Sequence, residues 1–179
     1  MSGADQRPLR AVLDTCVLFP PLLRGLLLTL ADRGMVVPLW SEAIAAEWLH
    51  LAARRGDLEG AEAALGRMRA RWPEGQLPAS SGAHLDLPDA GDRHVLAAAI
   101  EGRADLIVTA NLRDFPARLV APHGLRARSP DDLVMDFWLE APGLVEAAVA
   151  LLWPGLAGRA LRRALGKAGL RRLGKALGE

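Results

Sequence analysis

The residues of this sequence that are best suited to chemistry are acids at the ends of predicted strands. Asp14 comes directly after the apolar run Arg10–Leu13, and Asp114 lies shortly beyond the apolar run 105–109. Asp is uncommon inside strands, and open parallel sheets bind their ligands at the carboxyl ends of the strands. These two carboxylates are therefore the first candidates for a functional site.

Two further acids lie in helical patterns among apolar neighbours. Glu47 follows Ala46 and precedes Trp48, and Asp92 opens an alanine-rich segment. At an effective dielectric constant of about 20, two unit charges about 4 Å apart repel by about 4 kcal/mol. Four converging acids therefore predict a compensating cation. The alternative for Asp92 and Asp114 is a role as helix N-caps, and for Glu47 a solvated position on its helix.

Composition narrows the identity of that cation. The only lysines are Lys167 and Lys175, so no lysine side chain in the body can compensate the acids. The single cysteine, Cys16, excludes a multi-cysteine zinc site and is expected to be a buried packing residue. Oxygen ligands alone favour a hard ion, Mg²⁺ or Mn²⁺. The four histidines lack metal-ligand spacing, and we expect them on surfaces or helix faces: His50, His84, His94 and His123.

Several enzyme classes are excluded by motif. Each Gly-Lys pair, at residues 166–167 and 174–175, is followed by Ala, so the chain has no nucleotide-binding phosphate loop. It has no Gly-x-Ser-x-Gly elbow of a serine hydrolase. A phosphatase of the haloacid dehalogenase type needs Asp-x-Asp after its first strand, whereas Cys16 fills the second position here. The remaining candidates use acids and a metal ion.

Strand and helix patterns alternate along the chain, which predicts an α/β three-layer sandwich around a mainly parallel sheet. The expected strands are 10–13, 36–39, 105–109 and 125–128. The expected helices are 22–32, a Ser41-capped helix running to 55, 57–72, 94–101, a Ser129-capped helix and a short buried helix within 141–158. We expect two parts: a catalytic domain over residues 8–129 and a helical extension over 130–179.

The order of motifs resembles the PIN domain, a family of metal-dependent nucleases that includes many ribonuclease toxins of bacterial toxin–antitoxin pairs. The resemblance rests on hydrophobic-Asp-Thr at 13–15, Ser-x5-Glu at 41–47, Asp-x2-Val-Leu-Ala-Ala-Ala at 92–99 and Ile-Val-Thr-x-Asn-x2-Asp-Phe at 107–115. It covers about residues 9–128. A PIN fold is therefore expected.

The resemblance also implies roles for individual residues. Asp14, Glu47, Asp92 and Asp114 match the four acidic metal-site positions of the family. Cys16 departs from the pattern, because Asn or Ser is frequent at its position. Four residues match supporting polar positions around the acids: Thr15, Thr109, Asn111 and Asp89.

The function that this resemblance implies is Mg²⁺- or Mn²⁺-dependent endoribonuclease activity, with the chain as the toxin of a toxin–antitoxin pair. The expected partners are RNA, a cognate antitoxin protein and a second copy in a homodimer. The alternative is a catalytically silent PIN fold that binds nucleic acid or protein. We expect a cytoplasmic protein without a membrane span, because no apolar run reaches the length of a span.

Charge is divided unevenly along the chain. Residues 1–156 carry 15 Arg against 20 Asp and Glu, a net charge of −5, whereas residues 157–179 carry a net charge of +6. The basic tail has four possible roles: helices packed on the body, an RNA phosphate clamp, an antitoxin dock or an interfacial membrane helix. From charge alone, the candidate phosphate contacts are Arg113, Arg159, Arg162 and Arg163.

Overall fold

The structure is a computed structural model that describes residues 7–178. Its centre is a five-stranded sheet in which every pair of neighbours is parallel, in the order β3-β2-β1-β4-β5. Val12 pairs with Leu39 on one side and with Ile107 on the other, so the first strand of the chain lies in the middle. The strands are β1 (Arg10–Leu13), β2 (Val37–Ser41), β3 (Gln76–Leu77), β4 (Leu106–Val108) and β5 (Arg126–Arg128).

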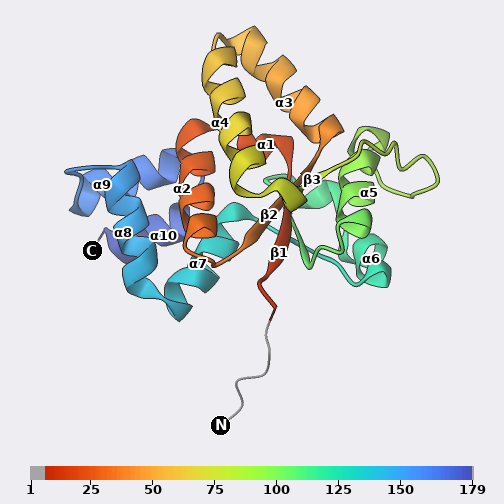
Figure 1. Cartoon of the computed structure of the whole chain (residues 1–179). Coiled ribbons are helices and arrows are strands. Elements are labelled where there is room, and N and C mark those ends of the chain that lie inside the picture. Colours follow the sequence, from red (N-terminus) through yellow and green to blue (C-terminus); the bar gives the residue numbers. More distant parts are fainter. Residues whose placement is uncertain (1–6, 179) are drawn as a thin grey trace.

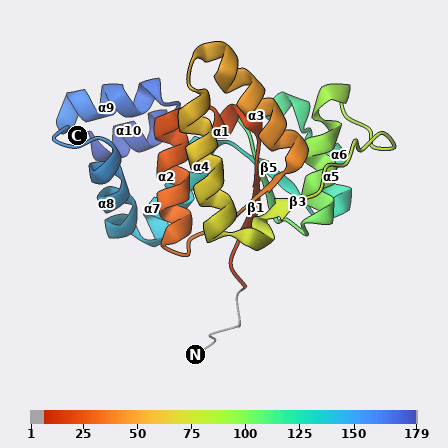
Figure 2. The same ribbon diagram turned by 45° about the horizontal axis from the view of Figure 1, so that its top comes forward.

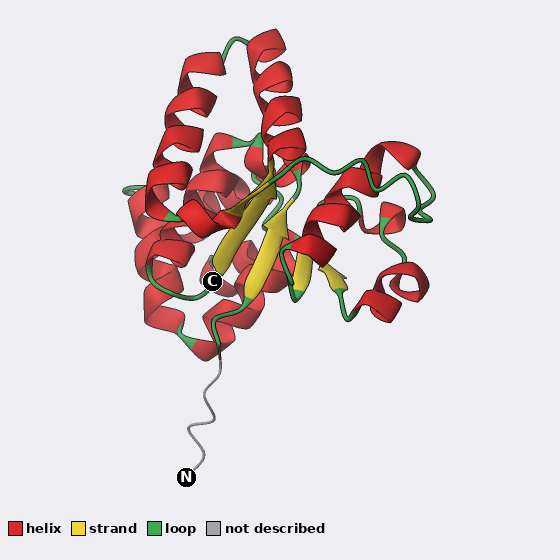
Figure 3. Ribbon diagram, turned by 45° about the vertical axis from the view of Figure 1, so that its right-hand side comes forward, coloured by secondary structure: helices red, strands yellow, loops and turns green. Residues whose placement is uncertain are grey.

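Helices cover both faces of the sheet, which confirms the predicted α/β sandwich. Figures 1 and 2 show α5 and α6 on one side and α2 with α7–α10 on the other, and Figure 3 shows the strands between them. The helices are α1 (Thr15–Leu18), α2 (Pro21–Asp32), α3 (Glu42–Arg55), α4 (Leu58–Arg71), α5 (Arg93–Glu101), α6 (Ala117–Val120), α7 (Pro130–Glu140), α8 (Pro142–Leu152), α9 (Gly158–Lys167) and α10 (Arg171–Leu177).

Local capping sets the start and end of the helix that carries Glu47. The Ser41 hydroxyl accepts a hydrogen bond from the Ile44 N–H at 3.1 Å, as expected of an N-cap serine. At the other end Gly56 adopts a left-handed conformation with φ of 77°, which a residue without Cβ reaches at little cost. Because Ser41 is also the last residue of β2, α3 starts at the carboxyl end of the sheet.

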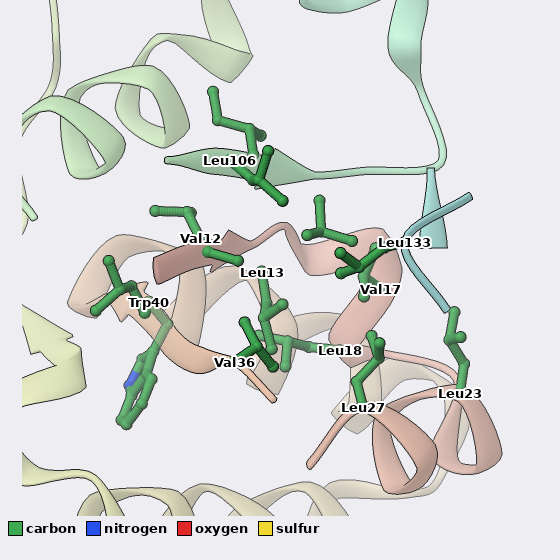
Figure 4. Packing of buried hydrophobic residues seen from close by; sticks show 14 of the residues in the cluster. Val12, Leu13, Val17, Leu18, Leu23, Leu27, Val36, Trp40, Leu106 and Leu133 are labelled. Carbon is green, nitrogen blue, oxygen red and sulfur yellow. The ribbon is translucent and has the colours of Figure 1, made fainter. Parts of the chain in front are cut away.

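The core is a layer of aliphatic side chains on both faces of β1. Figure 4 shows Val12 and Leu13 pointing to opposite sides of that strand, with Leu106 nearby. Trp40 and Trp48 are fully buried. Burial of one large apolar side chain stabilises the fold by about 1.5–3 kcal/mol, so this layer holds β1 and its end in place.

The C-terminal part is helical, as predicted, and its last helix, α10, is tied to α7. Asp131 accepts hydrogen bonds from the backbone N–H groups of Arg172 at 2.8 Å and Leu173 at 3.2 Å, at the start of α10. The Arg172 side chain forms an ion pair with Asp132. Leu165 is fully buried in the same apolar cluster as the body, and the boundary between 129 and 130 stays a prediction.

Three elements were not expected from the sequence: α1, β3 and α6. The two residues of β3 pair only with Trp40 and Ser41 of β2, so they form a strand because β2 lies beside them. No helix within residues 7–178 combines the length and the apolar character that crossing a membrane requires.

Candidate active site

Asp14 lies where β1 ends and α1 begins, and only 6% of its surface is exposed. Its backbone N–H donates to the Val108 carbonyl at 3.1 Å, which joins the ends of β1 and β4. One carboxylate oxygen accepts the Thr15 N–H at 2.7 Å, and the other accepts the Thr109 hydroxyl at 2.8 Å. The carboxylate therefore has a fixed orientation at the sheet edge.

Thr109 connects Asp14 to the loop that carries Asp114. It is fully buried, and its hydroxyl oxygen also accepts the Asn111 backbone N–H at 3.1 Å. Asn111 precedes the 3₁₀ turn η3 (Leu112–Asp114), and its carbonyl accepts the Asp114 N–H at 3.0 Å. The Asn111 side chain is exposed, so the contact that the structure shows for this residue is made by its backbone.

Cys16 has a polar role that the sequence analysis did not anticipate. Its half-buried thiol donates to the Asp14 carboxylate at 3.4 Å and accepts the Ala110 backbone N–H at 3.3 Å. Burial, followed by the charge of Asp14, raises the pKa of this thiol to about 11. The sulfur therefore remains a thiol at neutral pH and can keep donating to the carboxylate.

Glu47 approaches the same end of β1 from α3. The Thr15 hydroxyl donates to one oxygen of its carboxylate at 2.9 Å, and His94 Nε2 lies 3.4 Å from that oxygen. The Glu47 side chain is 55% exposed and that of His94 only 19%. His94 was expected on a surface or helix face, and no spacing along the chain relates it to Glu47. The packing of α3 beside α5 creates this contact.

Asp92 provides the electrostatic evidence that the acids gather. It ends the turn η2 (Ala90–Asp92), whose preceding residue Asp89 accepts the Gly91 N–H at 2.8 Å. Burial raises the pKa of Asp92 to about 6, and repulsion from Asp14, Asp114, Asp89 and Glu47 adds to the increase. The charges of these four carboxylates are therefore close enough to Asp92 to raise its pKa. We call the five acids together the acidic cluster.

Neither of the two acids offered as N-caps makes a capping hydrogen bond through its side chain. Asp92 precedes α5 without such a bond, and Asp114 is the last residue of η3 rather than the residue before a helix. Asp114 is half-buried. Local capping therefore does not account for either carboxylate, and the acidic cluster needs another explanation.

The cluster has the donor chemistry of a site for a hard divalent cation. Its donors are carboxylate oxygens, supported by the hydroxyls of Thr15 and Thr109, and a bound cation would relieve the repulsion that raises the pKa of Asp92. Within residues 7–178, no three Asp, Glu, His or Cys side chains already stand so that they could hold a metal ion. The assignment of individual ligands therefore stays a prediction.

The four arginines predicted to contact phosphate lie in two places. Arg113 belongs to η3, directly before Asp114, and is exposed. Arg159, Arg162 and Arg163 are exposed on α9, which packs against α10. Figures 1 and 2 show α9 on the opposite side of the sheet from α5. The structure brings the first of these arginines to the acids and places the other three on the far side of the sheet.

Comparison with known proteins agrees with this geometry. A family model described as PIN domain matches residues 10–113. A curated protein of Mycobacterium tuberculosis (strain ATCC 25618 / H37Rv), "Putative ribonuclease VapC50", is 51% identical over 45 residues, which are 25% of this chain and 27% of that protein. The match thus spans about a quarter of the relative's length. No solved structure matches significantly.

The matched range runs from the first residue of β1 into η3 and includes the cluster from Asp14 to Asp92, with Asp114 one residue beyond its end. The family model covers more than half of the chain, and the parallel sheet with its acidic edge agrees with it. The chain belongs to the PIN domain family.

Proposed function

We propose that this protein is an endoribonuclease that uses Mg²⁺ or Mn²⁺ to hydrolyse RNA phosphodiester bonds. The observation that supports it best is that the Asp14 and Glu47 carboxylates meet at Thr15, at the carboxyl end of β1, with Thr109 holding Asp14 from the end of β4. Besides burial, repulsion from the neighbouring acids contributes to the raised pKa of Asp92. A site that held no cation would gain nothing from this repulsion. The name of the matched M. tuberculosis protein, a ribonuclease, points to the same activity.

Each acid has a proposed role. Asp14 and Asp114 hold the ion directly, Asp92 holds a second ion or its waters, and Glu47 binds through water or assists proton transfer. When bound, the ion lowers the pKa of a water molecule and neutralises charge on the phosphate oxygens.

The neighbouring polar groups would keep these carboxylates in position. The hydroxyl of Thr109 holds one oxygen of Asp14, and the hydroxyl of Thr15 holds one oxygen of Glu47. Asp89 shapes the turn before Asp92 through its bond to the Gly91 N–H. Such neighbours orient the ligands of a metal site and tune their basicity.

The decisive experiment measures cleavage of single-stranded RNA by the pure chain with Mn²⁺, with EDTA, and with Mn²⁺ restored. We expect cleavage only when the ion is present. The Asp32→Asn variant is a matched control, because this exposed acid pairs with Arg71 outside the cluster. Binding of RNA without cleavage under any of these conditions would instead support the silent binding module.

We further propose that the chain is the toxin of a toxin–antitoxin pair acting in the cytoplasm, where its RNA substrate is found. The short match to VapC50 supports this role. Expression of the chain alone should arrest growth, and co-expression of the neighbouring reading frame should restore it. A growth arrest that persists in the Asp14→Asn variant would argue against toxicity through RNA cleavage.

Light scattering of the purified chain would test the predicted homodimer.

A further inference from the structure

A groove runs along the edge strand β5, which has no neighbouring strand on its outer side among the described residues. We call it the β5 groove. Its volume is about 400 Å³, within the range of small-molecule and nucleotide sites. Buried Phe115, Val120 and Leu125 close its inner side. Its accessible wall includes Leu112, Pro116, Ala117, Ala121, Arg126 and Arg128.

The turn η3 contributes both to the β5 groove, through Leu112, and to the acidic cluster, through Asp114. Leu112 is the first residue of η3, and Asp114 is the last, so one turn of chain separates the groove from a candidate metal ligand. The Leu112 side chain is 41% exposed, although it is large and apolar. Arg113 lies between the two residues and is exposed. The groove therefore lies within two residues of Asp114 along the chain.

The elements around the groove are basic, in contrast to the rest of the body. Segment 112–128 carries four arginines and one acid, whereas residues 1–156 as a whole carry a net charge of −5. Arg128 forms an ion pair with Asp136. Within residues 7–178, Arg113, Arg118 and Arg126 form no ion pair with a carboxylate. Their charge is available to a polyanion.

We propose that the β5 groove binds the nucleotides that adjoin the scissile phosphate of the RNA. This inference rests on the proposed ribonuclease function and adds the path of the substrate. An unpaired base packs against Leu112 and Pro116. Phosphates contact Arg126, which lines the groove, and Arg118, which is exposed on α6 between the lining residues Ala117 and Val120. Single-stranded RNA presents bases for such contacts, and arginine pairs well with phosphate.

The geometry of β5 favours RNA over an added peptide strand. Arg126 N–H donates to the Asp105 carbonyl, and the Arg128 carbonyl accepts the Thr109 N–H, so both residues use these backbone groups within the sheet. Because backbone groups alternate in direction along a parallel strand, Ala127 is then the one residue of β5 whose N–H and C=O point away from the sheet. A peptide added to this edge would gain few backbone hydrogen bonds. It would also need acidic side chains of its own to pair with the arginines.

The first test measures binding of a labelled single-stranded oligoribonucleotide to the full chain in EDTA, which prevents cleavage, over a series of salt concentrations. The test variant is Arg118→Gln/Arg126→Gln. Each lost phosphate contact should reduce the salt slope by about 0.7, so this variant should lose about 1.4 and bind roughly ten- to thirty-fold more weakly at 0.1 M salt. The control is Arg54→Gln/Arg55→Gln, in the last turn of α3, which should leave affinity and slope unchanged.

The second test distinguishes the packing of a base in the groove from the contacts between arginines and phosphates. Ala121→Trp should fill the groove and weaken binding of the oligoribonucleotide without changing its salt slope. Ala160→Trp, at an exposed position on α9, is the matched control. Thermal unfolding in EDTA should give the parent transition temperature for all variants, and this shows that they fold.

Two outcomes would overturn the proposal, and only the second of them also overturns the proposed ribonuclease function. If the parent chain binds and cleaves RNA while the groove variants bind with unchanged affinity and slope, the groove is not part of the RNA path and becomes a candidate surface for a protein partner. If the parent chain neither binds nor cleaves RNA, the proposed function itself fails and the groove proposal fails with it.

Discussion

The hydroxyl of Thr109 donates to the Asp14 carboxylate at 2.8 Å across 95 residues of sequence. It joins the ends of the two central strands, β1 and β4, and Asp14 thereby receives a donor from outside its own loop. Because Thr109 is fully buried and Asp14 nearly so, water cannot replace this bond. Several expected outcomes follow from this contact and its neighbours.

Replacing Thr109 should weaken both the fold and the site. In Thr109→Val the buried carboxylate loses a donor, and the loss of a hydrogen bond to a charged group costs about 1.5–3 kcal/mol. Thr109→Ser keeps the hydroxyl and should lose much less. Urea unfolding of the metal-free chain measures the loss of fold stability. Calorimetric titration with Mn²⁺ measures the weakening of the site. Equal stability of the Val and parent chains would contradict this account.

Neutralising a candidate ligand should separate activity from stability. Asp14→Asn and Asp114→Asn should each abolish Mn²⁺-dependent RNA cleavage, because each removes a proposed ligand charge. Without metal, Asp114→Asn should be folded, with stability equal to or above that of the parent, since one repulsive charge is gone. Asp14→Asn should be folded but no more stable than the parent, because its amide nitrogen replaces an oxygen that accepts a hydrogen bond. Cleavage assays test the loss of activity, and thermal unfolding in EDTA tests the stability of the metal-free variants. Cleavage at the parent rate by both variants would show that these residues are not ligands.

The raised pKa of Asp92 predicts how stability depends on pH. The folded chain holds the Asp92 proton up to a pH of about 6, whereas an unfolded Asp releases it near 3.9. The metal-free fold should therefore lose stability as pH rises through this interval, by about 1 kcal/mol after solvent screening is allowed for. Asp92→Asn should remove this loss. Denaturant unfolding at pH 4.5 and 7 is the measurement, compared with Asp32→Asn.

The same protonation should compete with metal binding. A cation binds the ionised carboxylates, so the apparent Mn²⁺ affinity of the parent chain should rise from mildly acidic to neutral pH. Calorimetry over that interval tests the expectation. An affinity that stays constant would argue against a shared carboxylate site.

The contact of His94 with Glu47 predicts a difference between two substitutions. His94→Gln keeps an N–H donor near the Glu47 carboxylate, and His94→Leu fills the space without one. We expect the Leu variant to lower kcat of RNA cleavage by about tenfold, in the range of effects of groups that orient metal-site ligands. The Gln variant should stay near the parent value, with KM little changed in both. Equal losses in both variants would point to packing rather than orientation of Glu47.

The arginines of α9 should matter less for RNA than those beside η3. Arg159→Gln/Arg162→Gln/Arg163→Gln removes three charges on the side of the sheet opposite α5. We expect the salt slope of RNA binding to change by less than the roughly 2 expected if all three held phosphates. A loss of the full value would instead establish the tail as the RNA clamp.

The elements whose causes are local could be predicted from the order of residues. The apolar run Arg10–Leu13 and the capping serines Ser41 and Ser129 predicted β1, α3 and α7, because burial pattern and N-caps act over a few residues. Motif order along the chain was enough to predict the PIN family, the parallel sandwich and the four acids. These features depend on residue type and spacing, which the sequence displays directly.

Contacts between side chains that are distant along the chain could not be predicted in this way. Three contacts join segments whose separation along the chain carries no periodic signal: the pairing of β3 with β2, the hydrogen bond from the Ala110 N–H to the Cys16 thiol, and the approach of His94 to Glu47. The raised pKa of Asp92 likewise depends on burial and on four charges, of which those of Asp14, Asp114 and Glu47 come from distant segments. Distance and solvent exclusion set these interactions, and both arise only when the sheet brings its strand ends together.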